Sequence, residues 1–225
     1  MEKGCAFCPL RSKTSLRLSD EDREKLTLNC AMVKFRKGDI VIRQGTLSTN
    51  VAYLISGLAK IHITGPYHEQ VVRVVKAPSY LGLPTTFGDK INQYSVTVIE
   101  NSEVCFIDIN VFRHLLRDNP DFSYEIILDL CKSELEVYNR CANRTQKQIR
   151  GKIADVLIEF SEKIFNAGSF TLPLTQEEIG NLVDSSRESV SKVLTEFDKD
   201  GIIKISAKKI EILNKKALLM ISSKG

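Results

Sequence analysis

The chain has 225 residues, of which 43% are hydrophobic and 27% charged, as in an ordinary soluble protein of one large or two modest domains. No apolar run approaches the ~18 residues of a membrane span, and residues 1–20 lack the apolar centre of a signal peptide, so we expect no membrane partner and a cytoplasmic location. The net charge of +4 is too small to indicate a partner by itself, and the lack of a Gly-rich phosphate loop, an H-x-x-x-H pair and a G-x-S-x-G elbow argues against an enzyme.

Six cysteines occur in a chain without an export signal, which favours thiols, metal ligands or core residues over a disulfide framework. Cys5 and Cys8 form a pair near the N-terminus with two residues between them. Cys30 is expected at the end of a first helix, and Cys105 lies in the strand-like segment VIENSEVCFIDI.

Residues 33–109 predict many short strands, because apolar residues alternate with polar ones between glycine-containing turns. The alternation is clear at Tyr53 and Ile55 and again at Val96 and Val98. This pattern is typical of a small antiparallel roll or barrel.

A long helix is predicted from about Pro120 to Ile149, with a stripe of residues that recur at three- and four-residue steps. In one interpretation this stripe packs on the chain's own strands, and in the other it is a coiled-coil seam between two subunits. Cys131 and Cys141 are expected as small apolar fillers of the helix. The stripe consists of Ile126, Ile127, Leu130, Glu134, Val137 and Cys141.

Two short helices are predicted within residues 174–213, in the manner of a helix-turn-helix. The first begins with a capping box formed by Thr175 and Glu178. Ser185 and Glu188 predict a second capping box at the start of the next helix.

The second helix has an apolar face and a polar face. The apolar face consists of Val190, Val193, Leu194 and Phe197. The opposite face presents Arg187, Glu188, Ser191 and Lys192. Side chains of these types, on the first two turns of a helix, can reach base edges in a major groove. Alternatively, Glu188 and Lys192 form only a surface ion pair, and the helices never contact DNA.

A two-stranded wing is predicted after Gly201, where apolar and polar residues alternate on either side of Ala207-Lys208. The last 25 residues contain six lysines and one acidic residue, Glu211. A basic wing and tail could contact phosphates while the helix contacts bases.

The helix pair resembles that of the catabolite activator/fumarate–nitrate regulator (CRP/FNR) family, whose pattern is roughly T-x-x-E-I-G followed by S-R-E-T-V-x-R-x-L. The matching residues are Thr175, Glu178, Ile179 and Gly180, then Ser186, Arg187, Glu188, Ser189 and Val190. Lys192 departs from the family's arginine and cannot offer a bidentate fork.

The strand-rich region adds a second point of resemblance. G-D-x-I-x-x-x-G from Gly38 to Gly45 and Y-x-I-x-x-G from Tyr53 to Gly57 are similar to the cyclic-nucleotide-binding-type roll of the same family. The resemblance therefore runs from about residue 18 to the end of the chain.

This resemblance implies an α+β fold with an N-terminal antiparallel β-roll, a long dimerisation helix and a C-terminal winged helix-turn-helix. The implied domains are residues 1–118, 119–149 and 150–225. The implied function is that of a sequence-specific transcriptional regulator, a homodimer that binds a two-fold symmetric DNA duplex and contacts RNA polymerase. The expected DNA-binding residues are Thr175, Gln176, Ser186, Arg187, Glu188, Ser189, Ser191, Lys192, Lys208 and Lys209. The alternative is a stand-alone ligand-binding module that acts through protein contacts.

Cyclic AMP is not expected as the signal. The family's pocket uses a glutamate for the ribose hydroxyl and an arginine–serine pair for the phosphate, whereas Tyr80 occupies the glutamate position here and Gln93 or Tyr94 the arginine position. Without a cation in that turn, the buried phosphate charge would be uncompensated. The expected effector pocket consists of Tyr80, Gly82, Leu83, Gln93, Tyr94 and Ser95.

A [4Fe–4S] cluster is a further expectation, because the sequence around Cys105 is very similar to the segment that carries a cluster ligand in the fumarate–nitrate regulator. Three N-terminal cysteines complete that cluster, and one of them is missing here. The candidate ligands are Cys5, Cys8 and Cys105, with Cys30 or a non-cysteine group as the fourth. The resemblance then implies oxygen or redox state as the signal, because loss of that regulator's cluster in oxygen disrupts its dimer. The alternatives are another metal or thiol redox role, or no metal, with Cys105 as a buried core residue. Haem is a further alternative, although the only histidines, His62, His68 and His114, are expected at the surface.

Overall fold

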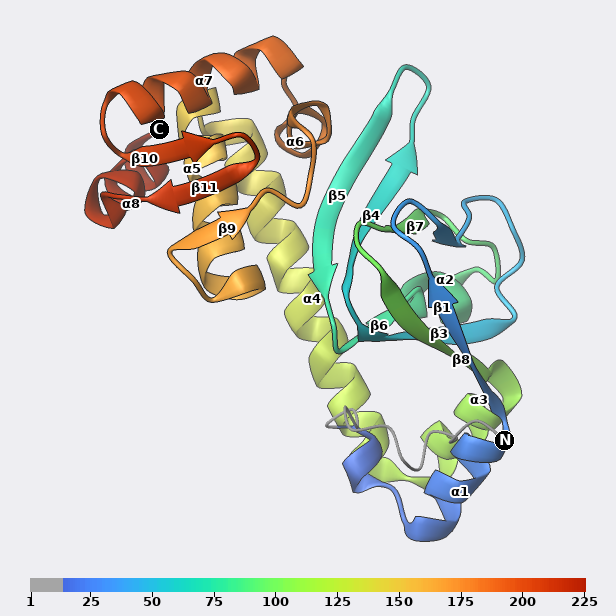
Figure 1. Cartoon of the computed structure of the whole chain (residues 1–225). Coiled ribbons are helices and arrows are strands. Elements are labelled where there is room, and N and C mark those ends of the chain that lie inside the picture. Colours follow the sequence, from blue (N-terminus) through green and yellow to red (C-terminus); the bar gives the residue numbers. More distant parts are fainter. Residues whose placement is uncertain (1–13) are drawn as a thin grey trace. The chain divides into compact units, whose positions relative to one another are not determined.

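The computed structural model describes residues 14–225, which divide into two compact units (Figure 1). The first unit extends to Glu136, and the second begins at Val137 and includes the short segment Tyr67–Val71. The division falls inside one long helix and coincides with neither of the predicted domain boundaries. The boundaries after residues 118 and 149 remain predictions. Within the described part of the chain, no helix is both long and apolar enough to cross a membrane.

Two four-stranded sheets with antiparallel pairings form the roll of the first unit, as the sequence predicted. One sheet has the order β1 (Cys30–Phe35), β8 (Ser102–Asp108), β3 (Asn50–Ser56) and β6 (Ser79–Leu81). The other has the order β2 (Ile40–Ile42), β7 (Ser95–Val98), β4 (Leu58–Thr64) and β5 (Glu69–Lys76). Strands far apart in the sequence are thus neighbours, and Met32 of β1 lies opposite Cys105 of β8.

The alternation along β3 supplies two cores, because successive side chains of a strand point to opposite faces. Ala52 and Leu54 belong to a core to which both sheets contribute. Val51, Tyr53 and Ile55 belong to a second core, on the other face of the same strand.

Helices contribute much of the rest of this second core. They are α1 (Asp20–Leu28), α3 (Ile109–Asp118) and the beginning of α4 (Pro120–Gln146). Their buried side chains include Phe112, Phe122 and Ile126. Asp108 fixes the start of α3, because its carboxylate accepts hydrogen bonds from the backbone N–H groups of Asn110 and Val111 at 2.8 and 3.2 Å. A short helix, α2 (Leu83–Gly88), follows β6.

The second unit is helical with one small sheet. After the end of α4 come α5 (Ile149–Glu159), a π-helical turn (Phe160–Phe165), β9 (Ser169–Thr171), α6 (Gln176–Val183), α7 (Arg187–Lys199), β10 (Ile203–Ser206), β11 (Lys209–Ile212) and α8 (Lys215–Lys224). The sheet has the order β10-β11-β9, so the predicted two-stranded wing has a third strand that the sequence analysis missed.

Candidate nucleic-acid interface

The first helix of the pair, α6, begins with the capping box that the sequence predicted. The backbone N–H of Glu178 donates to Thr175 Oγ1 at 3.2 Å, and the backbone N–H of Thr175 donates to Glu178 Oε2 at 2.8 Å. Both donors would otherwise lack a partner at the helix start. The side chain of Thr175 is therefore engaged in holding α6.

The second helix, α7, begins one residue later than predicted. Ser186, not Ser185, is its N-cap, and Ser186 Oγ accepts from the backbone N–H of Ser189 at 3.2 Å. The predicted capping box between Ser185 and Glu188 is wrong, because Ser186 is the residue with the extended backbone that a cap requires.

The turn between the helices depends on a close backbone approach at Gly180. The backbone N–H of Ser185 donates to the carbonyl of Gly180 at 3.0 Å. A Cβ added at Gly180 would lie 2.6 Å from the carbonyl oxygen of Ser185. Asp184 completes the turn in the left-handed region, with φ of 57°. The turn therefore has room for glycine but not for a larger residue at position 180.

A basic residue of α4 also holds this turn. The guanidinium of Arg144 donates to the carbonyl oxygen of Leu182, in the last turn of α6, at 3.1 Å. Burial lowers the pKa of Arg144, and the nearby carboxylate of Asp184 opposes that shift. Arg144 therefore stabilises the carboxyl end of α6, where helix carbonyls lack partners within the helix.

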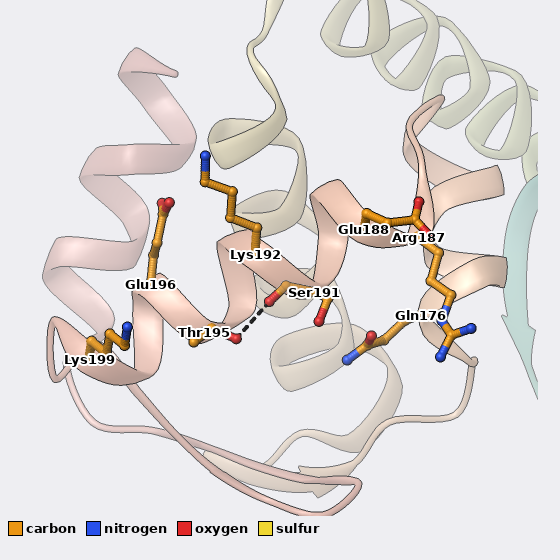
Figure 2. Close-up of a pocket in the computed structure, with 8 residues that line it drawn as sticks. All are labelled: Gln176, Arg187, Glu188, Ser191, Lys192, Thr195, Glu196 and Lys199. Carbon is orange, nitrogen blue, oxygen red and sulfur yellow. Dashed lines mark hydrogen bonds between the residues drawn. The ribbon is translucent and has the colours of Figure 1, made fainter.

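The apolar face of α7 is buried as predicted. Its members are Val190, Val193, Leu194 and Phe197. The opposite face is open and forms a shallow hollow of about 710 Å³ (Figure 2). The hollow is lined by Gln176, Arg187, Glu188, Ser191, Lys192, Thr195, Glu196 and Lys199.

Figure 2 shows Gln176 of α6 beside Arg187 of α7, so both helices contribute to the hollow. Three further lining residues were not predicted from the sequence, although they continue the polar face at three- and four-residue steps. They are Thr195, Glu196 and Lys199. The hydroxyl of Thr195 donates to the carbonyl of Ser191 at 2.8 Å.

The electrostatics of this face depend on Arg150 of α5. Its guanidinium forms ion pairs with Glu196 and, at 3.3 Å, with Asp200. It also lies 5.1 Å from the ring centroid of Phe197. Because Arg150 compensates Glu196, the lining retains the cations Arg187, Lys192 and Lys199 against the single carboxylate of Glu188. This positive balance suits phosphates and base acceptors.

The alternative from the sequence was that Glu188 and Lys192 form only a surface ion pair. Both residues are described and exposed, and no ion pair joins them. Their charged groups are therefore available to an external partner.

The wing carries two exposed lysines. Lys208 and Lys209 are exposed at the turn between β10 and β11, where Ala207 has a φ of 56°. The backbone N–H of Leu172 donates to the carbonyl of Lys208 at 2.8 Å, which anchors the turn from the third-strand side. The two ammonium groups are thus held on an ordered hairpin.

Helix α4 divides the predicted stripe between two faces. Ile126 is only 4% exposed and packs in the core of its own roll, so it is not available to a second subunit. Ile127 is 54% exposed, and Leu130, Glu134, Val137 and Cys141 are also exposed. The large exposed side chains include Tyr124, Ile127, Leu135 and Tyr138.

The roll contains a cavity of about 500 Å³ at the predicted effector position. Tyr80, Gly82, Leu83 and Tyr94 line it as predicted. Gln93 and Ser95 are not among the lining residues. Gln93 is exposed and donates to Asp89, and Ser95 is buried and accepts from the backbone N–H of Gln44 at 3.0 Å. Arg73 also lines the cavity, together with residues of α4, and neither was predicted from the sequence. The α4 residues are Asp129, Leu130, Lys132, Ser133 and Glu136.

The cysteines give the cluster expectation no direct support. Cys5 and Cys8 lie outside the described residues. Cys105 is 3% exposed within the core of the roll, and Cys30 is disulfide-bonded. Among residues 14–225, no group of three or more His, Cys, Asp or Glu side chains is placed to hold a metal.

Cys131 and Cys141 are exposed free thiols, so they do not pack as apolar fillers within the single chain. Their role as fillers between two α4 helices stays a prediction. Cys30 takes part in a disulfide, whereas the sequence favoured thiols, metal ligands or core residues.

Comparisons with known proteins agree with this geometry. Residues 151–221 match the Crp-like helix-turn-helix domain family, and residues 32–119 match the cyclic nucleotide-binding domain family. The CRP-like cAMP-activated global transcriptional regulator of Mycobacterium tuberculosis is 27% identical over 86% of this chain and 88% of its own length. The transcriptional activator protein FnrA of Stutzerimonas stutzeri is 26% identical over 94% of this chain and 88% of its own. The structure of FixK2 from Bradyrhizobium japonicum shares the fold, with a TM-score of 0.79 and 15% identity over 87% of this chain and 98% of that one.

Proposed function

Because this chain belongs to the CRP/FNR family of DNA-binding transcriptional regulators, we propose that it binds a two-fold symmetric duplex as a homodimer and reads the sequence with α7. The observation that carries the proposal is the open polar face of α7, backed by a fully buried apolar face. A helix exposed in this way can enter a major groove while its wing stays near the phosphates.

The roles of individual residues follow from their chemistry. Arg187 can donate two hydrogen bonds to a guanine, and Glu188 can accept one from a cytosine amine. Lys208 and Lys209 carry point charges on the wing and suit phosphates, which supply affinity without sequence preference. Thr175 and Ser186 cap the two helices and so position these groups.

The partner proposed for α4 is a second copy of this chain. Tyr124, Ile127, Cys131, Leu135 and Tyr138 are exposed and recur at three- and four-residue steps along one side of the helix. A two-fold DNA site needs a two-fold protein, and a parallel pair of α4 helices would bury this apolar row.

We also propose that the roll senses the signal and that the DNA-bound dimer contacts RNA polymerase. The first proposal is supported by the match to the cyclic nucleotide-binding domain family and by the cavity of the roll. The second is supported by relatives named as transcriptional activators.

The decisive experiment is retarded migration of a duplex that carries a two-fold TGTGA- or TTGAT-like site. We expect a complex of two chains per duplex, which an unlabelled scrambled duplex of equal length displaces only at much higher concentration. Equal competition by the scrambled duplex, or no complex at low salt, would contradict the proposal and favour a module that acts through protein contacts.

A further inference from the structure

The cavity of the roll has a volume of about 500 Å³, within the range of roughly 300–1,000 Å³ that is usual for small-molecule sites. We propose that it binds a small aromatic molecule of zero net charge. This inference rests on the proposed function, because it names the class of ligand that the sensing roll would take. The cavity's rings, its balance of charges and the helix at its edge favour such a ligand.

Three tyrosines supply aromatic walls. The rings of Tyr53 and Tyr80 are 4.7 Å apart between centroids and inclined by 55°, and Tyr94 lines the same cavity. The hydroxyl of Tyr80 is 3.0 Å from Thr14 Oγ1, so a hydrogen bond anchors the end of this side chain. Rings held at fixed angles favour a planar aromatic ligand through edge and face contacts.

The hydroxyl of Tyr94 remains protonated at neutral pH. Burial raises the pKa of Tyr94, and the guanidinium of Arg73 opposes that rise. Tyr94 therefore presents a neutral phenol beside the cation Arg73, not a phenolate.

The charged residues of the lining sum to zero. Arg73 and Lys132 are cations, and Asp129 and Glu136 are carboxylates. This balance holds whichever of these groups pair with one another. A ligand with a net charge would lose hydration on entering and gain no net compensation from the lining. A ligand that is uncharged, or that carries one charge of each sign, avoids this cost.

The edge of the cavity is also poorly suited to a phosphate. Pro84 lies in the first turn of α2, where helix N–H groups lack partners within the helix, and proline has no N–H to donate. The start of α2 therefore offers a phosphate fewer N–H donors than a helix start without proline, although Arg73 supplies a cation to the lining.

The ligand would contact α4 directly, because Leu130 and Ser133 line the cavity from that helix. Since α4 is also the helix proposed to pair with a second copy, binding in the cavity is linked to the arrangement of the dimer. A ligand that prefers one arrangement of α4 shifts the population toward it.

Four probes test the ligand class on the ligand-free full chain, by thermal melting and titration calorimetry. They are indole, which is uncharged, L-tryptophan, which is zwitterionic, benzoate, which is anionic, and cyclic AMP. We expect indole or L-tryptophan to raise the melting temperature and to bind one per chain, about tenfold or more tighter than benzoate or cyclic AMP. Whichever of indole and L-tryptophan binds more tightly shows whether the cavity prefers an uncharged or a zwitterionic ligand.

A variant that fills the cavity locates the site. Ser133→Phe is expected to weaken binding of the successful probe about tenfold or more. Asn139→Phe is the matched control, because Asn139 is exposed on the same helix and does not line the cavity, and it should bind like the parent. The melting temperatures of both variants without probe show that they fold.

Three outcomes would overturn the inference. They are tighter binding of benzoate or cyclic AMP than of both net-neutral probes, binding of no probe at all, or unchanged binding in a folded Ser133→Phe variant. Duplex binding by the same ligand-free sample separates the two proposals. If the duplex is bound but no probe is, only the ligand class fails, whereas loss of sequence-specific duplex binding counts against the proposed function itself.

Discussion

Asp198 of α7 accepts a hydrogen bond from the backbone N–H of Ile205 in β10, with 2.8 Å between the two atoms. The helix that faces outward and the hairpin beside it are therefore joined by a charge-assisted bond in a half-buried place. This bond helps to hold α7 and the wing at a fixed separation. Simultaneous contact of both elements with one duplex requires such a fixed separation.

Replacing Asp198 by alanine is expected to destabilise the protein by about 1–3 kcal/mol, because a partly buried N–H loses its charged acceptor. Urea unfolding measures the change. Asp198→Asn is the control, since its amide oxygen can still accept, and it should recover much of the loss. Equal losses in both variants would show that the hydrogen bond is not the cause.

Gly180→Ala is expected to abolish specific duplex binding and to lower stability by about 1–3 kcal/mol, since the added Cβ would lie 2.6 Å from the Ser185 carbonyl and the turn must move. Gly168→Ala is a matched control in the same unit, because a Cβ there meets nothing within 4 Å. Circular dichroism melts and retarded duplex migration measure both effects. If the two variants behave alike, the turn does not depend on the close approach at Gly180.

The proposed pairing of α4 predicts that Leu135→Asp yields monomers in sedimentation and loses binding to a duplex with two half-sites. A charge there would be buried in the apolar row without a partner. Val137→Asp is the comparison. Val137 lies two residues after Leu135, about 200° further around the helix axis, and so on a different face of α4. Dissociation of Val137→Asp with a dimeric Leu135→Asp would move the seam to the stripe that the sequence predicted.

The iron–sulfur prediction remains open to a chemical test. Cys30 and Cys105 contact the same apolar core on one face of the sheet that contains β1 and β8. A cluster would require Cys30 or another group as a reduced ligand beside the N-terminal pair. The prediction is a brown protein after anaerobic purification under reducing conditions, with about four irons per chain, that Cys105→Ser bleaches.

The preparation could instead stay colourless after iron and sulfide reconstitution and bind the duplex equally well in air and without it. That outcome would show that the protein holds no iron–sulfur cluster. The roll would then sense a small molecule through its cavity or sense nothing.

Local sequence patterns were enough to predict the features that depend on neighbouring residues. The capping box at Thr175, the buried face of α7 and the antiparallel strands of the roll all follow from short-range spacing. The N-cap of α7 was misplaced by one residue because Ser185 and Ser186 are chemically equal, and only the backbone conformation selects between them.

Features that depend on tertiary placement could not be predicted in this way. Apolar residues occur on two sides of α4, and their spacing alone does not reveal that the roll covers Ile126 and leaves Ile127 open. Arg73 and Lys132 reach the cavity from elements far apart in the sequence, so no local motif contains them. The three-residue strand β9 is too short to show an alternation.

The central claim, that α7 reads base edges, is tested most directly by the affinity of Arg187→Ala for the best duplex and for duplexes with one base pair changed at a time. The account predicts a loss of about 1–3 kcal/mol on the best site and a relaxed preference at one base pair. The double variant Lys208→Ala/Lys209→Ala should instead weaken all sequences about equally and flatten the dependence on salt. If Arg187→Ala binds the best site as tightly as the parent and keeps the parent's preference at every base pair, α7 is not the recognition helix.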